Sequence, residues 1–231
     1  MKVLIVTGST IVPIDRVRCL SNIFRGRTGT EISYEFLNRK HNVTILTSNE
    51  DLIERDFLRK YDGLFKFKTY DDLYLQMEYL VKNSYFNVIL FGPAVSDYRV
   101  TGTFNRNIYG EFERIDSSKK MSSKIDDLYL HLEPTLKIID LIRSEWNYQN
   151  ILVKFKLEVG LEDCELVPIL KHSIKQSKAD IIVGNCLEWM KEKAIIYRKN
   201  GKWDYVLRSG LPLALYNEIV KIDERRLSND V

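Results

Sequence analysis

Residues 3–10 read Val-Leu-Ile-Val-Thr-Gly-Ser-Thr, a short apolar run that ends at a glycine and small hydroxyl residues. This composition is typical of a buried strand of a parallel sheet followed by a tight turn. The chain then needs about twenty residues, through Gly26 and Gly29, before helical spacing begins, whereas most such turns have only a few. Because ligands bind where turns leave the carboxyl ends of parallel strands, we interpret this segment as a binding loop.

The rest of the chain repeats an alternation of strands and helices that favours right-handed crossovers and a parallel sheet. We expect strands at residues 3–6, 43–46, 65–68, 88–91, 127–132, 151–157 and 180–183. We expect helices at residues 28–40, 135–143, 162–176 and 211–222, and one more that Asp71 caps. Asn200-Gly201 predicts a hairpin between residues 194–198 and 203–207.

Residues 94–124 interrupt this alternation, because they contain few apolar runs and end in a cluster of serines and lysines. A long irregular segment in a compact domain is usually functional, so we expect a mobile loop at about residues 99–124. The predicted fold is α/β: a three-layer, mostly parallel doubly wound (Rossmann-like) sheet with a long mobile loop and a C-terminal β-hairpin. A single domain over residues 1–231 is expected, with a frayed charged tail.

Composition indicates a globular protein and excludes several classes. The formal net charge of +3 is small and its cations are scattered, so we expect no nucleic-acid partner. No apolar stretch approaches the roughly twenty residues that span a bilayer, so we expect no membrane partner. The three cysteines, Cys19, Cys164 and Cys186, show neither metal-ligand nor disulfide spacing. We therefore expect a reduced, cytoplasmic protein, and no metal site built from His131 or His172.

Several short motifs follow predicted strands, and each has a plain structural alternative. Gly8-Ser9-Thr10 can cradle a phosphate, although on its own the motif is better explained as a tight turn. Asp97 follows the strand at residues 88–91 and can accept from a ribose or hold Mg²⁺, or it can cap a turn. Lys120, in a loop, can neutralise a phosphate or merely solubilise the surface. Taken singly, none of these motifs identifies a function.

Their order along the chain resembles phosphopantothenate–cysteine ligase (phosphopantothenoylcysteine synthetase). The family carries a strand with Gly-Gly-Thr and then a Pro-Ile-Asp-x-Val-Arg-x-Ile-Ser/Thr-Asn run, which residues 8–10 and 13–22 match. Its Ala-Val-Ala/Ser-Asp-Tyr/Phe motif matches residues 94–98, and its Lys-Ile element matches Lys120-Met121. Its later strands are represented by residues 154–156 and 179–185. The similarity runs to about residue 225 and resembles the stand-alone form, without the flavin decarboxylase domain.

The resemblance implies a two-step ligation in coenzyme A biosynthesis. The carboxylate of 4′-phosphopantothenate attacks the α-phosphate of CTP, or ATP in eukaryotes, and L-cysteine then displaces the nucleotide. It also implies Mg²⁺, a homodimer with the site completed at the subunit interface, and catalytic roles for Asn22 and Lys120. The nucleotide-binding residues that it implies are Gly8, Ser9, Thr10, Ala94, Asp97, Phe155, Lys175 and Lys178. The substrate-binding residues that it implies are Arg18, Arg25 and Gly26.

The chain departs from the family pattern at Ser9, Phe24, Lys154 and Cys186. These departures motivate an alternative, a non-catalytic relative that binds a nucleotide or a partner. A nicotinamide oxidoreductase would explain the alternation of strands and helices, but the expected Gly-x-Gly-x-x-Gly spacing is missing. Base choice between CTP and ATP stays open at this point.

Overall fold

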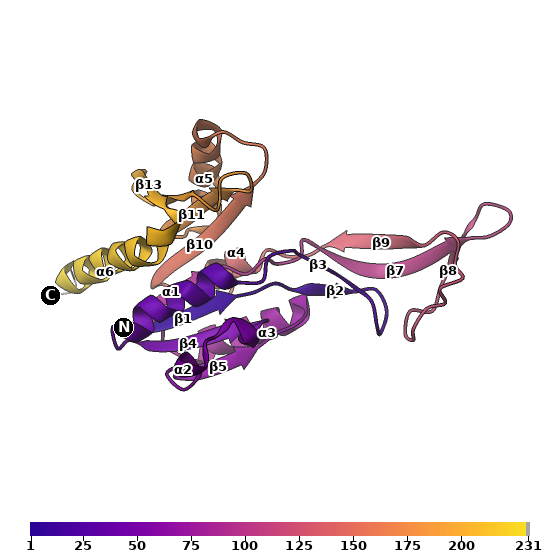
Figure 1. The fold of residues 1–231 in the computed structure, drawn as a ribbon, viewed down its shortest axis with the longest axis horizontal. Coiled ribbons are helices and arrows are strands. Elements are labelled where there is room, and N and C mark those ends of the chain that lie inside the picture. The colour runs from indigo at the N-terminus through magenta and orange to yellow at the C-terminus, as the bar shows by residue number, and fades with distance from the viewer. Residues whose placement is uncertain (230–231) are drawn as a thin grey trace.

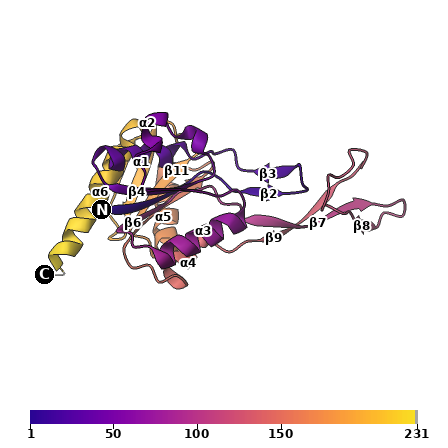
Figure 2. The ribbon, with the colours of Figure 1, turned by 90° about the horizontal axis from the view of Figure 1, so that it is seen from below.

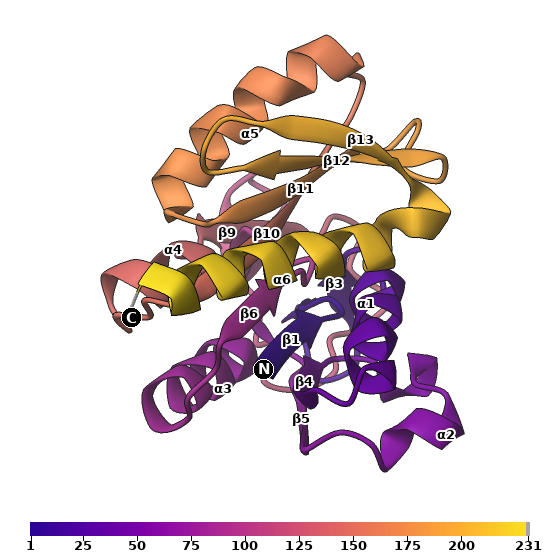
Figure 3. The same cartoon turned by 90° about the vertical axis from the view of Figure 1, so that its left-hand side faces the viewer.

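The computed structural model describes residues 1–229 and contains a central eight-stranded sheet between two layers of helices (Figure 1, Figure 3). Six neighbouring strands are parallel, and the last two are antiparallel and form the predicted hairpin. From one edge the strands are β13 (Trp203–Leu207), β12 (Lys193–Arg198), β11 (Ile181–Cys186), β10 (Ile151–Glu158), β6 (Val88–Phe91), β1 (Lys2–Thr7), β4 (Asn42–Thr47) and β5 (Gly63–Lys66). The predicted fold class is confirmed.

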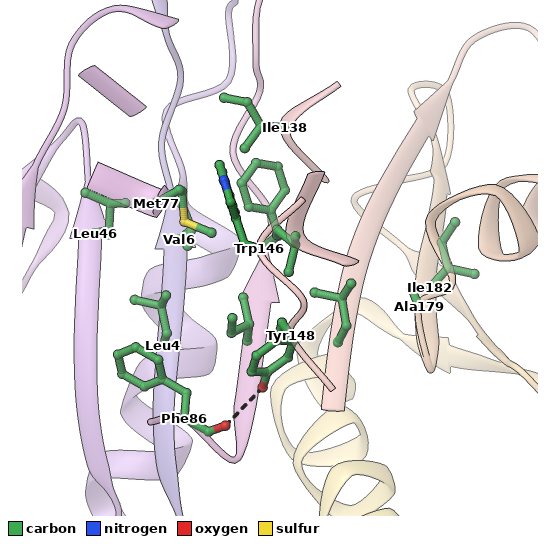
Figure 4. Close-up of a cluster of buried hydrophobic side chains, with 14 of the residues drawn as sticks. Leu4, Val6, Leu46, Met77, Phe86, Ile138, Trp146, Tyr148, Ala179 and Ile182 are labelled. Carbon is green, nitrogen blue, oxygen red and sulfur yellow. Dashed lines mark hydrogen bonds between the residues drawn. The ribbon is translucent and has the colours of Figure 1, made fainter. Parts of the chain in front are cut away.

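Each face of the sheet has its own hydrophobic core, because neighbouring residues of a strand point to opposite faces. The helices α1 (Arg27–Asn38) and α6 (Leu211–Asn229) cover one face. The helices α3 (Tyr70–Asn83), α4 (Ile138–Ser144) and α5 (Asp163–Ser177) cover the other. On that second face, Figure 4 shows Trp146 and Tyr148 packed among aliphatic side chains, with the Tyr148 hydroxyl donating to the Phe86 carbonyl at 3.2 Å.

The helix α3 begins at a different residue from the one predicted. Its N-cap is Thr69, whose side chain accepts from the Asp72 amide, while the Asp72 carboxylate accepts from the Thr69 amide. This reciprocal pair is a capping box, and it leaves Asp71 exposed inside the first turn. The prediction of an Asp71 cap is therefore wrong, because a threonine two residues earlier has the extended backbone that a cap needs.

Replacing Thr69 by alanine is expected to lower the free energy of unfolding by about 1 kcal/mol, since one amide of the first turn loses its acceptor. Urea denaturation measures this difference. The matched control is Asp71→Ala, which is expected to stay within about 0.5 kcal/mol of the wild type. An equal loss in both variants would contradict the assigned cap.

The segment predicted to be irregular contains two strands. The strands β7 (Tyr98–Arg106), β8 (Phe112–Arg114) and β9 (Tyr129–Pro134) form an antiparallel sheet that extends away from the body of the molecule (Figure 1, Figure 2). We refer to this sheet as the arm. Both of its faces are largely open, so its strands lack the apolar pattern of buried strands. A short hairpin of β2 (Ile11–Pro13) and β3 (Cys19–Ser21) extends in the same direction.

The helix α6 continues beyond the predicted end at residue 222. Arg226 donates to the carboxylate of Asp180 at 3.1 Å and to the carbonyl of Gln149 at 3.2 Å. Arg143 holds the other oxygen of the same buried carboxylate at 2.9 Å. The predicted fraying is therefore wrong up to residue 229, because ion pairing anchors the charged end of the helix to the sheet. Outside the positions corrected above, the predicted strands and helices agree with the structure to within a few residues.

Candidate functional site

A cleft of about 1230 Å³ opens at the carboxyl edge of the central sheet. The chain leaves β1 toward β4 on one side, whereas β6 and β10 lie on the other side. The cleft is lined by the loops that follow β1, β6 and β11 and by the last residues of β10. The order of the strands thus reverses between β1 and β6. Doubly wound sheets bind ligands at such a switch point, because the loops after the two strands diverge and leave an opening between them.

The loop after β1 is packed against the start of α1 through glycines. Gly8 and Gly26 have φ angles of 108° and 97°, a left-handed conformation that glycine adopts without strain. A Cβ on Gly26 would lie 2.4 Å from the Gly8 nitrogen, so a larger residue would separate the two segments. Gly26 is the N-cap of α1, and the first turn of the helix lines the cleft without an acidic residue. Its free amides and helix dipole suit an anion.

Asn22 connects the two loops of the cleft. Its Nδ2 donates to the carbonyl of Ala94, the third residue after β6, at 3.0 Å. The Ala94 amide in turn donates to the Gly8 carbonyl at 2.9 Å. Asn22 lines the cleft and is exposed, so its second Nδ2 hydrogen and its Oδ1 remain available to a bound molecule.

Ser9 and Thr10 do not line the cleft. The Ser9 amide donates to Ser48 Oγ at 2.8 Å. The buried Thr10 hydroxyl donates to Ser96 Oγ at 3.0 Å and accepts from the Ser96 amide at 2.8 Å. Both residues therefore join neighbouring loops at the edge of the sheet.

Cations outnumber carboxylates around the cleft. Its cationic residues are Arg25, Arg27, Lys137, Lys156, Lys191 and Arg208, and its acidic residues are Glu31, Glu35, Asp97 and Glu192. Asp97 forms an ion pair with Lys137, and Arg208 hydrogen-bonds Thr28. Phe155, at the end of β10, also lines the cleft beside Gly92, where a Cβ would lie 3.0 Å from the phenyl ring. This surplus of positive charge favours a ligand with several negative charges.

Arg18 is engaged in a contact that sequence reasoning missed. The buried Asp15 carboxylate accepts from the amides of Val17 and Arg18, from Arg18 Nε at 3.0 Å and from the Met121 amide at 3.1 Å. Arg18 Nη2 also donates to the Met121 carbonyl at 2.6 Å. We call Asp15, Arg18 and Met121 the clamp, because they attach the loop at residues 115–128 to the β2–β3 hairpin.

The ionised form of Asp15 is strongly favoured. Burial opposes ionisation, but the hydrogen bonds from Val17, Arg18 and Met121 outweigh it and hold the Asp15 pKa well below its usual range. A group with a lowered folded pKa stabilises the fold above its unfolded pKa, and this contribution is lost as the pH falls through the folded pKa. The clamp is therefore expected to persist at neutral pH and to weaken only in strong acid.

Lys120 precedes Met121 and is exposed outside the cleft. Within residues 1–229, its side chain has no hydrogen-bond partner. Asn22 and Lys120, the predicted catalytic pair, are therefore not brought together within one chain in this structure.

Lys175 and Lys178 also lie away from the cleft. The helix α5 leaves the carboxyl end of β10 and returns to the start of β11, so its last turn reaches the opposite edge of the sheet. Lys178 caps that turn, and its carbonyl accepts from Arg143 Nε at 3.3 Å. The structure thus gathers Gly8, Asn22, Arg25, Gly26, Ala94, Asp97 and Phe155 in the cleft, and leaves Ser9, Thr10, Arg18, Lys120, Lys175 and Lys178 outside it.

Sequence reasoning missed Lys137 and Arg208 as cleft residues. Arg208 directly follows β13, whose carboxyl end lies at the same edge of the sheet as that of β11. Its position directly after a strand is the signal that could have identified Arg208 as a cleft residue. Lys137 fell inside the predicted helix at residues 135–143, whereas in the structure it precedes α4 as the N-cap.

Within residues 1–229, no three acidic, histidine or cysteine side chains are grouped so as to hold a metal ion. In the same part of the chain, no helix has the length and apolar character needed to cross a membrane.

Comparison with known proteins gives one family match and several relatives. Residues 1–206 match the family described as DNA/pantothenate metabolism flavoprotein C-terminal domain. The coenzyme A biosynthesis bifunctional protein CoaBC of Thermococcus kodakarensis is 28% identical over 187 residues, which cover 81% of this chain and 41% of that protein. The protein of the same name from Methanocaldococcus jannaschii is 26% identical over 186 residues, covering 80% of this chain and 40% of that protein. This chain thus spans less than half the length of these relatives.

Solved structures show the same fold. The DNA/pantothenate metabolism flavoprotein from Streptococcus pneumoniae superposes with a TM-score of 0.82 at 26% identity, covering 96% of this chain and 99% of that one. A Cab2 mutant in complex with phosphopantothenate-cysteine superposes with a TM-score of 0.72 at 16% identity, covering 99% and 88%.

Proposed function

We propose that this chain, which belongs to the DNA/pantothenate metabolism flavoprotein C-terminal domain family, ligates 4′-phosphopantothenate to L-cysteine with a nucleoside triphosphate. The observation that carries the proposal is the cleft itself. It combines the open N-terminus of α1, a cationic rim and the Asn22 amide at the switch point of the sheet. The relatives named for coenzyme A biosynthesis, and the Cab2 complex with phosphopantothenate-cysteine, support the same substrates.

In the first step, a carboxylate oxygen of phosphopantothenate bonds to the α-phosphorus of the nucleotide, and pyrophosphate leaves. Both reactants are anions, so their approach requires cationic and amide donors. The rim residues Arg25, Arg27 and Lys156 and the amides at the start of α1 supply such donors. Lys120, when brought to the phosphates, would neutralise the charge on the departing pyrophosphate.

In the second step, the cysteine amine attacks the acyl carbon and the nucleoside monophosphate leaves with its bonding electrons. The amine loses a proton as the amide forms. Asn22 is suited to this step, because its Oδ1 can accept from the amine while its remaining Nδ2 hydrogen contacts the acyl oxygen. Its bond to Ala94 fixes the amide plane, so the orientation is set before substrate binds.

The proposed cosubstrate is CTP or ATP, with Mg²⁺. Asp97, in the loop after β6, is a carboxylate that could hold Mg²⁺ together with nucleotide phosphates and waters, the usual ligands of this ion in such sites. The bound ion would neutralise phosphate charge. The free thiols of Cys19 and Cys164, both exposed, agree with the reducing cytoplasm that we propose as its location.

We propose that the active form is a homodimer in which Lys120 reaches the cleft of the neighbouring subunit. The arm carries exposed apolar side chains at its end, with Ile108 91% and Tyr109 81% exposed. Exposed apolar surface of this kind marks protein contact sites. The clamp holds Lys120 outside its own cleft, so a second subunit offers the simplest way to complete the site.

The test incubates the protein with phosphopantothenate, cysteine, Mg²⁺ and either CTP or ATP, and measures the products by mass spectrometry. The proposal predicts an amide whose mass is that of phosphopantothenate plus cysteine less one water, together with one nucleoside monophosphate. A folded dimer that makes neither product with either nucleotide would support a non-catalytic binding protein.

A further inference from the structure

A side pocket of about 210 Å³ adjoins the cleft on the face of the sheet that α4 and α5 cover. Pro93, Lys137, Phe155 and Lys156 line both spaces, so the side pocket lies directly beside the cleft. The Phe155 ring itself packs on the opposite face of the sheet. The deeper walls come from the end of β6, from β10 and from the helices α4 and α5. A molecule held in the cleft can therefore extend a ring-sized group into the side pocket.

Lys154 is a cation buried in this pocket. Its side chain points from β10 toward α5, the residue is 8% exposed, and Nζ donates only a long bond of 3.4 Å to the Ser173 carbonyl. Burial lowers the pKa of Lys154. The ammonium group can donate three hydrogen bonds, so most of its capacity is unused.

Asp140, in the first turn of α4, lies across the pocket. Its Oδ2 accepts from Gln176 Nε2 at 2.8 Å. Its Oδ1 is buried and has no partner among the described residues. A buried polar atom without a partner is costly, and such atoms in native proteins often mark the position of a missing ligand.

The pocket therefore offers a buried acceptor, Asp140 Oδ1, and a buried donor, Lys154 Nζ, beside the cleft. A planar heterocycle with an amine beside a ring acceptor complements this arrangement. We propose that Asp140 and Lys154 select the nucleobase, Asp140 accepting from an exocyclic amine and Lys154 donating to the adjacent ring acceptor. The inference rests on the proposed ligase function. Cytosine and adenine carry this edge, whereas uracil and guanine present a carbonyl in place of that amine.

The decisive variant is Asp140→Asn. Gln176 Nε2 requires an acceptor, so it keeps the asparagine oxygen on its side and turns the NH₂ group toward the pocket. The exocyclic amine of cytosine or adenine then faces another donor, whereas the carbonyl of uracil or guanine gains a donor to accept from. We expect the binding preference for CTP over UTP, or for ATP over GTP, to fall at least about tenfold.

A second variant, Lys154→Met, keeps most of the length of the side chain and removes its donor. It is expected to weaken binding of the preferred nucleotide at least about tenfold, because the ring acceptor loses its partner. Lys171→Met, an exposed position on α5, is the matched control and is expected to retain wild-type binding. Thermal melting without nucleotide shows whether each variant is folded.

Isothermal titration of the full chain with each of the four nucleoside triphosphates gives the readout. A lowered preference in Asp140→Asn, with control binding unchanged, supports the inference. If the wild type binds nucleotide and ligates, and both pocket variants keep its affinity and its base preference, the inference is overturned and the ligase function stays intact. Absence of nucleotide binding by the folded wild-type dimer overturns both.

Discussion

Replacing Lys120 by glutamine is expected to slow acyl-nucleotide formation by about 10²- to 10³-fold, the usual cost of removing one donor that stabilises charge in a transition state. The fold should not change, since Lys120 is exposed. Rapid-quench measurement of pyrophosphate release in the absence of cysteine isolates this step. The neighbouring exposed residue supplies the control, because Lys119→Gln removes the same charge one position away. Equal rates in both variants would remove Lys120 from the proposed mechanism.

Mixing two inactive variants tests whether Lys120 acts across the proposed dimer. In a heterodimer of Lys120→Gln and Asn22→Ala, a shared site receives either both intact residues or neither. Random exchange of subunits should then restore about a quarter of wild-type activity. If each cleft uses its own Lys120, every site in the heterodimer lacks one residue, and the mixture stays inactive. That result, with subunit exchange verified, would contradict the shared site.

Replacing Asp15 by alanine is expected to lower kcat by about 10²-fold, the scale of effect when a catalytic group is displaced by about 1 Å. The carboxylate accepts from Arg18 Nε and from the Met121 amide, and through them it fixes the residue that follows Lys120. Its removal leaves these donors without a partner and releases the loop. Because Asn22 and the cleft are unchanged, the KM for nucleotide should change less than kcat.

Three comparisons separate this positioning role from general instability. Asp15→Asn keeps acceptor capacity and is expected to recover part of the lost activity. Asp116→Ala removes an exposed carboxylate from the same loop, one that accepts from the Ser118 amide, and should have little effect. Limited proteolysis should cleave residues 115–128 faster in Asp15→Ala. Unchanged proteolysis and unchanged kcat would contradict the clamp.

Much of the central sheet could be predicted from the sequence because its strands are buried on both faces. Runs such as Val3–Val6 and Val88–Phe91 contain only apolar residues, and the glycines after β1 mark the turn. The motif order also predicted the family correctly, since Asn22, Ala94 and Gly26 belong to loops that meet at one edge of the sheet. These contacts could be predicted because each residue follows the carboxyl end of a parallel strand or precedes the next helix at the same edge of the sheet.

The arm and the clamp could not be predicted for a common reason. Strand β7 is stabilised by pairing with β9 rather than by burial, so the run Tyr98–Arg106 reads as polar and irregular. The hydrogen bond from the Met121 amide to Asp15 joins residues more than a hundred positions apart, and nothing local in Pro-Ile-Asp indicates that partner. Lys175 and Lys178 were placed by resemblance alone, and the direction of α5 puts them at the other edge.

Pyrophosphate release by the purified protein with Mg²⁺ and CTP or ATP, measured with and without phosphopantothenate, tests the proposed ligase function directly. We expect release that requires phosphopantothenate and rises to steady turnover when cysteine is added, because the acyl-nucleotide is then consumed. Release without phosphopantothenate, or no release with either nucleotide from the folded protein, would contradict the ligase function.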